Sequence, residues 1–296
     1  MFLVTGANGQ LGNELKLLLQ DKAVYVDRAE LDITDAEAVQ TYAAKQKWEA
    51  IINCAAYTAV DKAESDAETA EKINVLGPEN LAKTGIPLIQ ISTDYVFDGR
   101  NCRPYNEDDE PYPQSVYGRT KLAGEQAVLQ NAATAVIIRT AWLYSTFGNN
   151  FVKTMRRLGK ERASLNVVFD QAGTPTYARD LAQAIVDILP QIKPGTKEVY
   201  HFSNEGVCSW YDFATAIMAQ SDLDCEVLPI ESKDYPTPAV RPSYSVLNKA
   251  KIKKDFGIKI NHWAVSLADC VEKLENGFSS LNFCGCFCRL CWECIS

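Results

Sequence analysis

Two short motifs in the first half of the chain combine residue types that can bind phosphate and transfer a proton. The segment Gly6–Gly12 directly follows the apolar residues Phe2–Val4. A glycine-rich turn between a strand and a helix can hold a pyrophosphate, because glycine lets the backbone approach the ligand and the helix start offers unpaired N–H groups. Tyr117 and Lys121 are four positions apart, so on a helix they share one face and an ammonium can lie beside a phenol. In this order, with Thr93 between them, the motifs favour a nicotinamide-dependent enzyme that acts on a carbonyl or an alcohol.

The glycine turn predicts where the dinucleotide lies. Its spacing is G-x-x-G-x-x-G, and the strand before it and the helix after it are the context that such a site needs. The residues that we expect at the pyrophosphate are Gly6, Asn8, Gly9, Gln10, Leu11 and Gly12.

Two pairs of residues further along are candidates for the adenosine end of the cofactor. Asp27 ends the second expected strand, where a carboxylate can bind the ribose hydroxyls. Arg28 beside it could instead pair with a 2′-phosphate, so the sequence leaves NADPH and NADH open. Asp32 and Ile33 are expected against the adenine, although Asp32 is also typical of an acidic residue at a helix start.

Thr93, Tyr117 and Lys121 form the predicted catalytic set. A carbonyl that accepts hydride builds negative charge on oxygen, so the site needs a proton donor within hydrogen-bond distance. A free phenol has a pKa of roughly 10, and a nearby ammonium together with an oxidised nicotinamide would lower the pKa of Tyr117. Thr93 would give a second hydrogen bond to the same oxygen. Taken alone, a tyrosine and a lysine at this spacing are also typical of an ordinary surface helix.

The alternation of strands and helices in the first half predicts an α/β fold, a Rossmann-type doubly wound parallel sheet. One long helix is expected over 67–83. In such a sheet the ligand lies at the carboxyl ends of the strands. After Trp142 the pattern is less regular, and we expect a smaller C-terminal α/β domain that binds the substrate. The predicted boundaries are 1–145 for the dinucleotide-binding domain with a returning segment at about 178–204, 146–177 and 205–279 for the substrate domain, and 280–296 for a cysteine-rich tail.

The composition limits the partners of the chain. It has 296 residues and a formal net charge of −8, which argues against nucleic acid, because phosphate backbones require basic surfaces. The first residues are typical of a strand and a glycine turn, so we expect no leader, and the sequence has no apolar run that could span a bilayer. We therefore expect a cytoplasmic protein with no membrane partner.

The ten cysteines divide into two groups. Scattered cysteines in a cytosolic protein are usually small core residues, and Cys54, Cys102, Cys208, Cys225 and Cys270 are of this kind. The others crowd the end of the chain at Cys284, Cys286, Cys288, Cys291 and Cys294. Zinc sites normally use two C-x-x-C pairs separated by a loop, whereas these pairs overlap, so a disordered or non-native tail is the preferred interpretation over a metal site.

Beyond these motifs, several longer stretches resemble the extended short-chain dehydrogenase/reductase family. The resemblance runs through nearly the whole chain, up to about residue 279. The matching stretches are Ser92–Gly99, Arg139–Tyr144, Gly148–Met155, Asp170–Thr176, Trp210–Asp212 and Thr237–Pro242. The later stretches discriminate best, because the glycine turn and the Tyr/Lys pair occur across the wider superfamily.

This resemblance implies a reaction and assigns site residues. The implied reaction is hydride transfer from NADPH or NADH to C4 of dTDP-4-dehydro-β-L-rhamnose, which gives dTDP-L-rhamnose. Asn53, Ala55, Ala56 and Tyr57 would contact the cofactor, together with Tyr117 and Lys121. Tyr95, Trp142, Asn150 and Arg241 would contact the substrate.

Two of these assignments have structural alternatives. Trp142 suits a deoxyhexose, whose C–H face packs on an aromatic ring, but it could also be a core tryptophan at a strand end. Arg241 suits the substrate diphosphate, but a proline-flanked structural arginine is equally possible.

Some members of the family dimerise through a magnesium ion held by glutamates. Glu14 stands at one such position, but Arg179 occupies another where a carboxylate is expected. The resemblance therefore leaves both a monomer and a homodimer open, and it makes a magnesium ion doubtful.

Three rival functions share this fold. A nucleotide-sugar 4,6-dehydratase usually has Asp-Glu after the threonine as acid and base, whereas this chain has Asp94 and Tyr95. An epimerase would keep its cofactor bound and show no net reduction. A non-catalytic regulatory subunit, such as that of methionine adenosyltransferase, would bind the cofactor without turnover.

Overall fold

The computed structural model describes residues 1–276, and the predicted tail at 280–296 lies outside them. Its centre is a six-stranded parallel sheet in the order β10-β5-β4-β3-β1-β2. The strands are β1 (Phe2–Thr5), β2 (Ala23–Val26), β3 (Ala50–Asn53), β4 (Leu88–Thr93), β5 (Ala135–Thr140) and β10 (Lys197–His201). Every residue of β3 and β5 is buried, as expected for central strands covered on both faces. The predicted Rossmann-type sheet is confirmed, and β10, from a later part of the chain, forms one of its edges.

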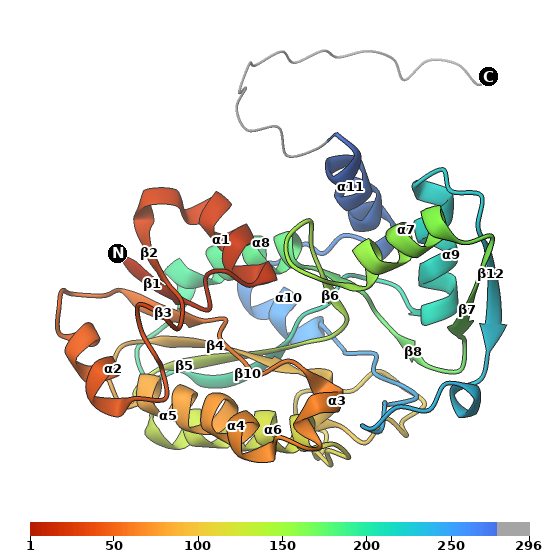
Figure 1. Ribbon diagram of the computed structural model, residues 1–296. Coiled ribbons are helices and arrows are strands. Elements are labelled where there is room, and N and C mark those ends of the chain that lie inside the picture. Colours follow the sequence, from red (N-terminus) through yellow and green to blue (C-terminus); the bar gives the residue numbers. More distant parts are fainter. Residues whose placement is uncertain (277–296) are drawn as a thin grey trace.

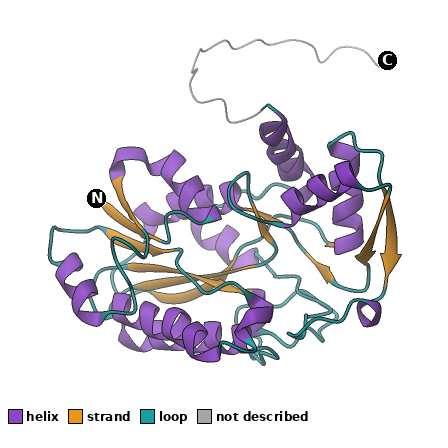
Figure 2. Ribbon diagram, in the orientation of Figure 1, coloured by secondary structure: helices purple, strands orange, loops and turns teal. Residues whose placement is uncertain are grey.

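Two layers of helices cover the sheet (Figures 1 and 2). One layer is formed by α1 (Gln10–Leu19), α8 (Ala178–Ile188) and α10 (Ala250–Phe256), and the other by α2 (Ala36–Ala43), α4 (Ala67–Glu71), α5 (Gly77–Ala82) and α6 (Val116–Asn131). Their apolar faces form two buried clusters, one on each face of the sheet.

The helix predicted over 67–83 is not continuous. A π-helical turn, Lys72–Leu76, separates α4 from α5. The Asn74 side chain points inward and bonds Tyr57 and Thr120 Oγ1. Helix α6 passes very close, since a Cβ added at Gly124 would lie 2.0 Å from Asn74 O. The wider turn lets Asn74 reach these partners, which a helical period in the sequence does not reveal.

A second group of elements packs around its own core, to the right of the sheet in Figure 1. It contains α7 (Phe151–Glu161), α9 (Trp210–Gln220) and α11 (Trp263–Glu275), with the parallel pair β7 (Ser164–Val168) and β12 (Glu226–Ile230). Short strands connect it to the sheet: β6 (Leu143–Tyr144), β8 (Ala172–Gly173), β9 (Thr176–Tyr177) and β11 (Cys208–Ser209). Cys208, Cys225 and Cys270 are buried free thiols of this core. Cys54 is partly buried and Cys102 is exposed, so the expectation of a core residue is wrong for Cys102. The five cysteines after residue 279 lie outside the described residues.

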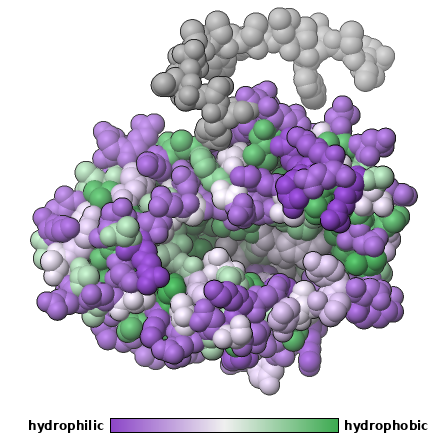
Figure 3. Space-filling view, in the orientation of Figure 1, coloured by the Kyte–Doolittle hydropathy of each residue, from purple (hydrophilic) through white to green (hydrophobic). Residues whose placement is uncertain are grey.

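The surface is hollowed between the sheet and this second group (Figure 3). Val60 of helix α3 (Val60–Ala63) borders this hollow, and the segment 236–249 contacts α3 through the pair of Arg241 and Asp61. Within residues 1–276, no helix is long and apolar enough to cross a membrane.

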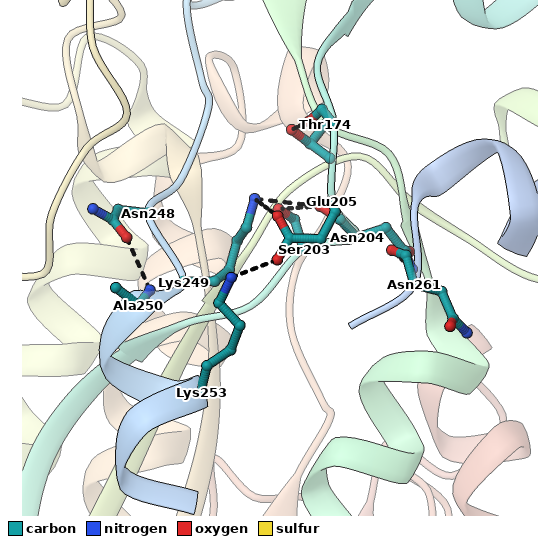
Figure 4. Close-up of polar contacts among 10 residues, drawn as sticks. Thr174, Ser203, Asn204, Glu205, Asn248, Lys249, Ala250, Lys253 and Asn261 are labelled. Carbon is teal, nitrogen blue, oxygen red and sulfur yellow. Dashed lines mark hydrogen bonds and ion pairs between the residues drawn. The ribbon is translucent and has the colours of Figure 1, made fainter. Parts of the chain in front are cut away.

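A buried asparagine ties the two groups of elements together where the chain leaves β10. Asn204 Oδ1 accepts from Tyr177 N at 2.8 Å, and its Nδ2 donates to Asp180 at 2.6 Å and to Ser266 at 2.9 Å. Lys249 Nζ donates to Asn204 O at 3.3 Å (Figure 4). The hollow is therefore framed by parts whose relative position is fixed by specific polar contacts.

Candidate active site

A cavity of about 810 Å³ lies beyond the carboxyl ends of β1, β3 and β4, where a doubly wound sheet binds its ligand. Most of the predicted site residues border it. These are Gly6, Gly9, Gln10, Leu11, Gly12, Asp27, Arg28, Asp32, Ile33, Ala55, Ala56, Thr93, Tyr95, Tyr117, Lys121 and Trp142. The predicted residues Asn8, Asn53, Tyr57, Asn150 and Arg241 are not part of its wall.

The glycine turn has the geometry of a phosphate site. Gly6 has φ +65°, and a Cβ there would lie 2.5 Å from Ala55 N. A Cβ at Gly12 would lie 2.5 Å from Gly6 O. Helix α1 begins after Gly9 with no side-chain cap, so its first N–H groups are available to an anion. These features fit a dinucleotide pyrophosphate.

The end of β2 combines a carboxylate and a guanidinium. Asp27 accepts from Asn8 N at 3.0 Å and from Arg28 N at 2.8 Å, while Asp27 N donates to Glu30 at 2.9 Å. The Arg28 side chain is 80% exposed and pairs with Asp32 at 3.3 Å. A hydrogen bond from Thr34 lowers the pKa of Asp32. The Asp27 carboxylate can accept from ribose hydroxyls, and Arg28 is free to move toward a 2′-phosphate.

The loop after β3 is held by a buried amide. Asn53 accepts from Thr5 Oγ1 at 2.6 Å and from Ala55 N at 3.1 Å, and it donates to Gln90 at 2.7 Å. It supports the loop from below, while Ala55 and Ala56 border the cavity. Tyr57 donates to Asp66 at 3.1 Å, outside the wall.

The structure brings the three predicted catalytic residues together. Thr93 ends β4, Tyr117 and Lys121 lie on α6, and all three are buried side chains at the cavity. Ser115 is the N-cap of α6, and its side chain accepts from Gly118 N at 3.1 Å. Lys121 Nζ donates to Ile91 O at 2.7 Å. Burial lowers the pKa of Lys121 to about 8.

The pKa of Tyr117 is shifted opposite to the predicted direction in the protein alone. Burial raises it well above its usual value, although the Thr93 hydroxyl acts to lower it. The ammonium of Lys121 is bonded to a backbone carbonyl and does not offset the loss of hydration. The neutral phenol, which is the proton-donating form, is therefore strongly favoured.

Asp94 is a polar residue of the site that the sequence interpretation did not assign. It is 2% exposed, and its Oδ1 accepts from Thr93 Oγ1 at 2.9 Å. Burial raises the pKa of Asp94 to about 6. In the sequence, only its position directly after Thr93 indicates that Asp94 lies at the site, and that position does not reveal that its carboxyl group is buried.

The predicted substrate residues differ in their surroundings. Trp142 has φ +47° and stacks on Trp210, with ring centroids 3.5 Å apart, so one face of its indole is covered. Arg241 donates to Tyr95 OH at 3.2 Å and pairs with Asp61 at 2.6 Å. Arg241 therefore lies behind the wall residue Tyr95.

Two predicted residues have fully structural contacts. Asn150 caps α7 by accepting from Lys153 N at 3.1 Å. Its Nδ2 donates to Gln10 and to two backbone carbonyls. The side chain of Asn150 does not border the cavity. Glu14 is 1% exposed and accepts from Ser145 Oγ at 2.6 Å. No group of three or more potential metal ligands occurs within residues 1–276.

Comparisons with known proteins agree with this geometry. The model of the RmlD substrate binding domain matches residues 1–276. A dTDP-4-dehydrorhamnose reductase of Aggregatibacter actinomycetemcomitans is 43% identical over 282 residues, which cover 90% of this chain and 96% of the relative. The crystal structure of a dTDP-4-dehydrorhamnose reductase from Clostridium acetobutylicum has a TM-score of 0.88 and 44% identity, and the match covers 93% of this chain and 99% of the other. The dTDP-4-dehydrorhamnose reductase from Bacillus anthracis, solved in complex with NADP, has a TM-score of 0.88 and 39% identity, covering 92% and 99%. The chain belongs to the RmlD substrate binding domain family, in which these relatives are dTDP-4-dehydrorhamnose reductases.

Proposed function

We propose that the chain reduces the C4 ketone of dTDP-4-dehydro-β-L-rhamnose to dTDP-L-rhamnose with NADPH or NADH. The observation that carries this proposal is one cavity with a glycine turn at the end of β1 and Thr93, Tyr117 and Lys121 at β4 and α6. Membership of a family whose relatives are named for this reaction gives the substrate.

Each catalytic residue has a separate task in this reaction. When bound, the nicotinamide supplies the hydride to the carbonyl carbon. Tyr117 donates its proton to the carbonyl oxygen, because the buried phenol is neutral and lies beside Thr93. Thr93 adds a second hydrogen bond to the oxygen as negative charge develops on it. Lys121 lies one helical turn beyond Tyr117, where its ammonium stabilises the phenolate that remains.

The substrate is proposed to lie along the wall opposite α1. Tyr95 packs edge-to-face on Tyr117, with ring centroids 5.4 Å apart, so a sugar at Tyr117 also meets Tyr95. Trp142 offers the indole face or edge that Trp210 does not cover. Arg241 can reach the diphosphate if it exchanges its Asp61 partner for phosphate oxygens, which a fork-shaped guanidinium binds well.

The cofactor is proposed to span from Asp27 and Arg28 to Tyr117. Segments 1–145 and 178–204 would bind it, and 146–177 with 205–279 would complete the sugar site. For the assembled protein we propose a monomer or a homodimer, which light scattering after size-exclusion chromatography distinguishes.

The test is oxidation of NADPH and of NADH with dTDP-4-dehydrorhamnose, generated in situ from dTDP-glucose. We expect turnover by the wild type and a loss of kcat of about 10²–10⁴ in Tyr117→Phe, the range for a positioned acid. Cofactor binding by the variant should be unchanged. A folded, cofactor-binding wild type that gives no turnover contradicts the proposal and favours an epimerase or a regulatory subunit.

A further inference from the structure

Asp94 is a buried acid beside the proposed catalytic hydroxyl, and the reaction described above gives it no task. Its Oδ1 accepts from Thr93 Oγ1, but its Oδ2 has no hydrogen-bond partner within residues 1–276. The Ser245 hydroxyl is close enough to lower the pKa of Asp94, yet its Oγ also makes no hydrogen bond there. A buried carboxylate with one unpaired oxygen is costly, which favours the protonated acid.

The hydrogen-bond capacity of Thr93 makes this protonation state important. A hydroxyl has one proton and two lone pairs, and one lone pair of Thr93 accepts from Tyr95 N at 3.3 Å. An ionised Asp94 can only accept, so it takes the single proton of Thr93 and leaves none for a substrate oxygen. A protonated Asp94 can donate to the second lone pair of Thr93. The Thr93 proton is then free to turn toward the cavity.

We infer that Asp94 is a positioning residue for the reduction, and that its protonated form turns the Thr93 hydroxyl toward the substrate oxygen. The inference rests on the proposed function, because it assigns Thr93 the second hydrogen bond to the developing oxyanion. In the ionised form a lone pair of Thr93 would face that oxyanion instead, which opposes the reaction.

The groups around Asp94 determine how it titrates. Tyr95 on the 3₁₀ turn Asp94–Val96 and Tyr117 on α6 are the titratable neighbours, and burial raises the pKa of both phenols. Lys121 follows Tyr117 on α6, and the segment 236–249 contributes uncharged Ser245 and, behind Tyr95, Arg241. Burial raises the pKa of Asp94 to about 6. A bound substrate removes further water, which raises the pKa again.

The test compares kcat across pH for the wild type, Asp94→Asn, Thr93→Val and the double variant. Asparagine keeps the shape and can always donate to Thr93. We expect the Asp94→Asn rate to stay within about threefold of the wild-type low-pH plateau, without the loss of rate that the wild type shows as Asp94 ionises. The kcat of Thr93→Val should be about 10²–10³ times lower than that of the wild type, and it should not fall further as Asp94 ionises. The double variant should be no slower than Thr93→Val.

Infrared difference spectra between the wild type and Asp94→Asn, with cofactor and product bound, report the protonation state directly. We expect a protonated-carboxyl band in the wild type at the pH of maximal kcat. An ionised Asp94 at that pH, or losses that multiply in the double variant, would overturn the inference. The same holds if folded Asp94→Asn falls as far as Thr93→Val at every pH. A wild type without turnover would instead contradict the proposed function, and the Thr93→Val profile gives a test that does not need the Asp94 variant to fold.

Discussion

Lys121 places a buried cation in the site, and its replacement by methionine is expected to stabilise the protein. Its side chain is 4% exposed, and Nζ donates to Ile91 O at 2.7 Å. The nearest acid on the same helix, Glu125, is already bonded to Arg139 at 2.7 Å and to Ser92 Oγ at 2.5 Å. Desolvation of the ammonium is therefore only partly compensated, although Glu125 does act to raise the pKa of Lys121.

The size of this effect follows from the pKa. Burial lowers the pKa of Lys121 from 10.5 to about 8, which corresponds to about 3 kcal/mol of destabilisation when the group is charged in both states. Methionine has a similar unbranched shape and carries no charge. Below pH 8 the variant should therefore gain stability, by about 3 kcal/mol less the loss of the bond to Ile91 O, which is about 1 kcal/mol.

The sign of the pH dependence separates this explanation from simple repacking. Between pH 8 and 10.5 the unfolded wild type binds more protons at Lys121 than the folded protein does, so wild-type stability rises with pH there. The variant lacks this contribution, and its advantage over the wild type should shrink by about 3 kcal/mol across that interval.

The assay is urea unfolding of both proteins from pH 7 to pH 10.5, compared as differences so that other titrations cancel. Lys254→Met, which removes an exposed lysine, controls for the change in net charge. A stability difference between Lys121→Met and the wild type that stays constant across this interval would refute the reasoning. Lys121→Met should also lose most of its reductase activity, since the phenolate partner is gone.

Other contacts give further expected outcomes. In Gly12→Ala the new Cβ would lie 2.5 Å from Gly6 O, so the turn must shift. The cofactor Kd, measured by fluorescence titration, should then rise at least about tenfold. An unchanged Kd contradicts the assignment of this turn to the cofactor phosphates. Asp61→Asn should lower the substrate KM a few-fold by releasing Arg241, while stability changes by less than about 1 kcal/mol because the pair is partly exposed. A higher KM in steady-state kinetics would mean that Asp61 orients Arg241 for the substrate instead of withholding it. Asn204→Ala should lower the free energy of unfolding by about 2–4 kcal/mol, because it leaves the buried partners of the amide without hydrogen bonds. Urea unfolding measures this, and a loss below about 1 kcal/mol would contradict it.

The fold could be predicted from the sequence because its signals are local. Buried parallel strands are continuous apolar runs, and β3 and β5 are entirely buried. The glycine spacing is also visible in the local sequence, although in the fold the turn packs against Ala55 of the loop after β3. The Tyr117/Lys121 pair needs a single helix, which the Ser115 side chain caps by accepting from Gly118 N.

Features that depend on distant partners could not be predicted in this way. Trp142 stacks on Trp210, and Arg241 is held by Asp61, contacts that no spacing in the sequence indicates. Asn150 lies in a family-like stretch, yet its side chain is used to cap α7. Its amide also donates to Gln10, which is 140 positions earlier in the sequence, so a residue that marks the family can serve the fold.

Burial makes the charged forms of Asp94 and Lys121 destabilising, and the two free-energy costs depend on pH in opposite directions. The raised pKa of Asp94, about 6, means that its carboxylate destabilises the folded protein above that pH, and the cost disappears as pH falls toward 3.8. The lowered pKa of Lys121, about 8, means that its ammonium destabilises the protein below that pH. Both costs are therefore present together between about pH 6 and pH 8, where each is of the order of 3 kcal/mol. A bound substrate removes water from around Asp94, so the carboxylate takes up a proton from solvent more readily and the cost of burying its charge falls. Part of the free energy that this charge costs the free protein is then recovered when the substrate binds.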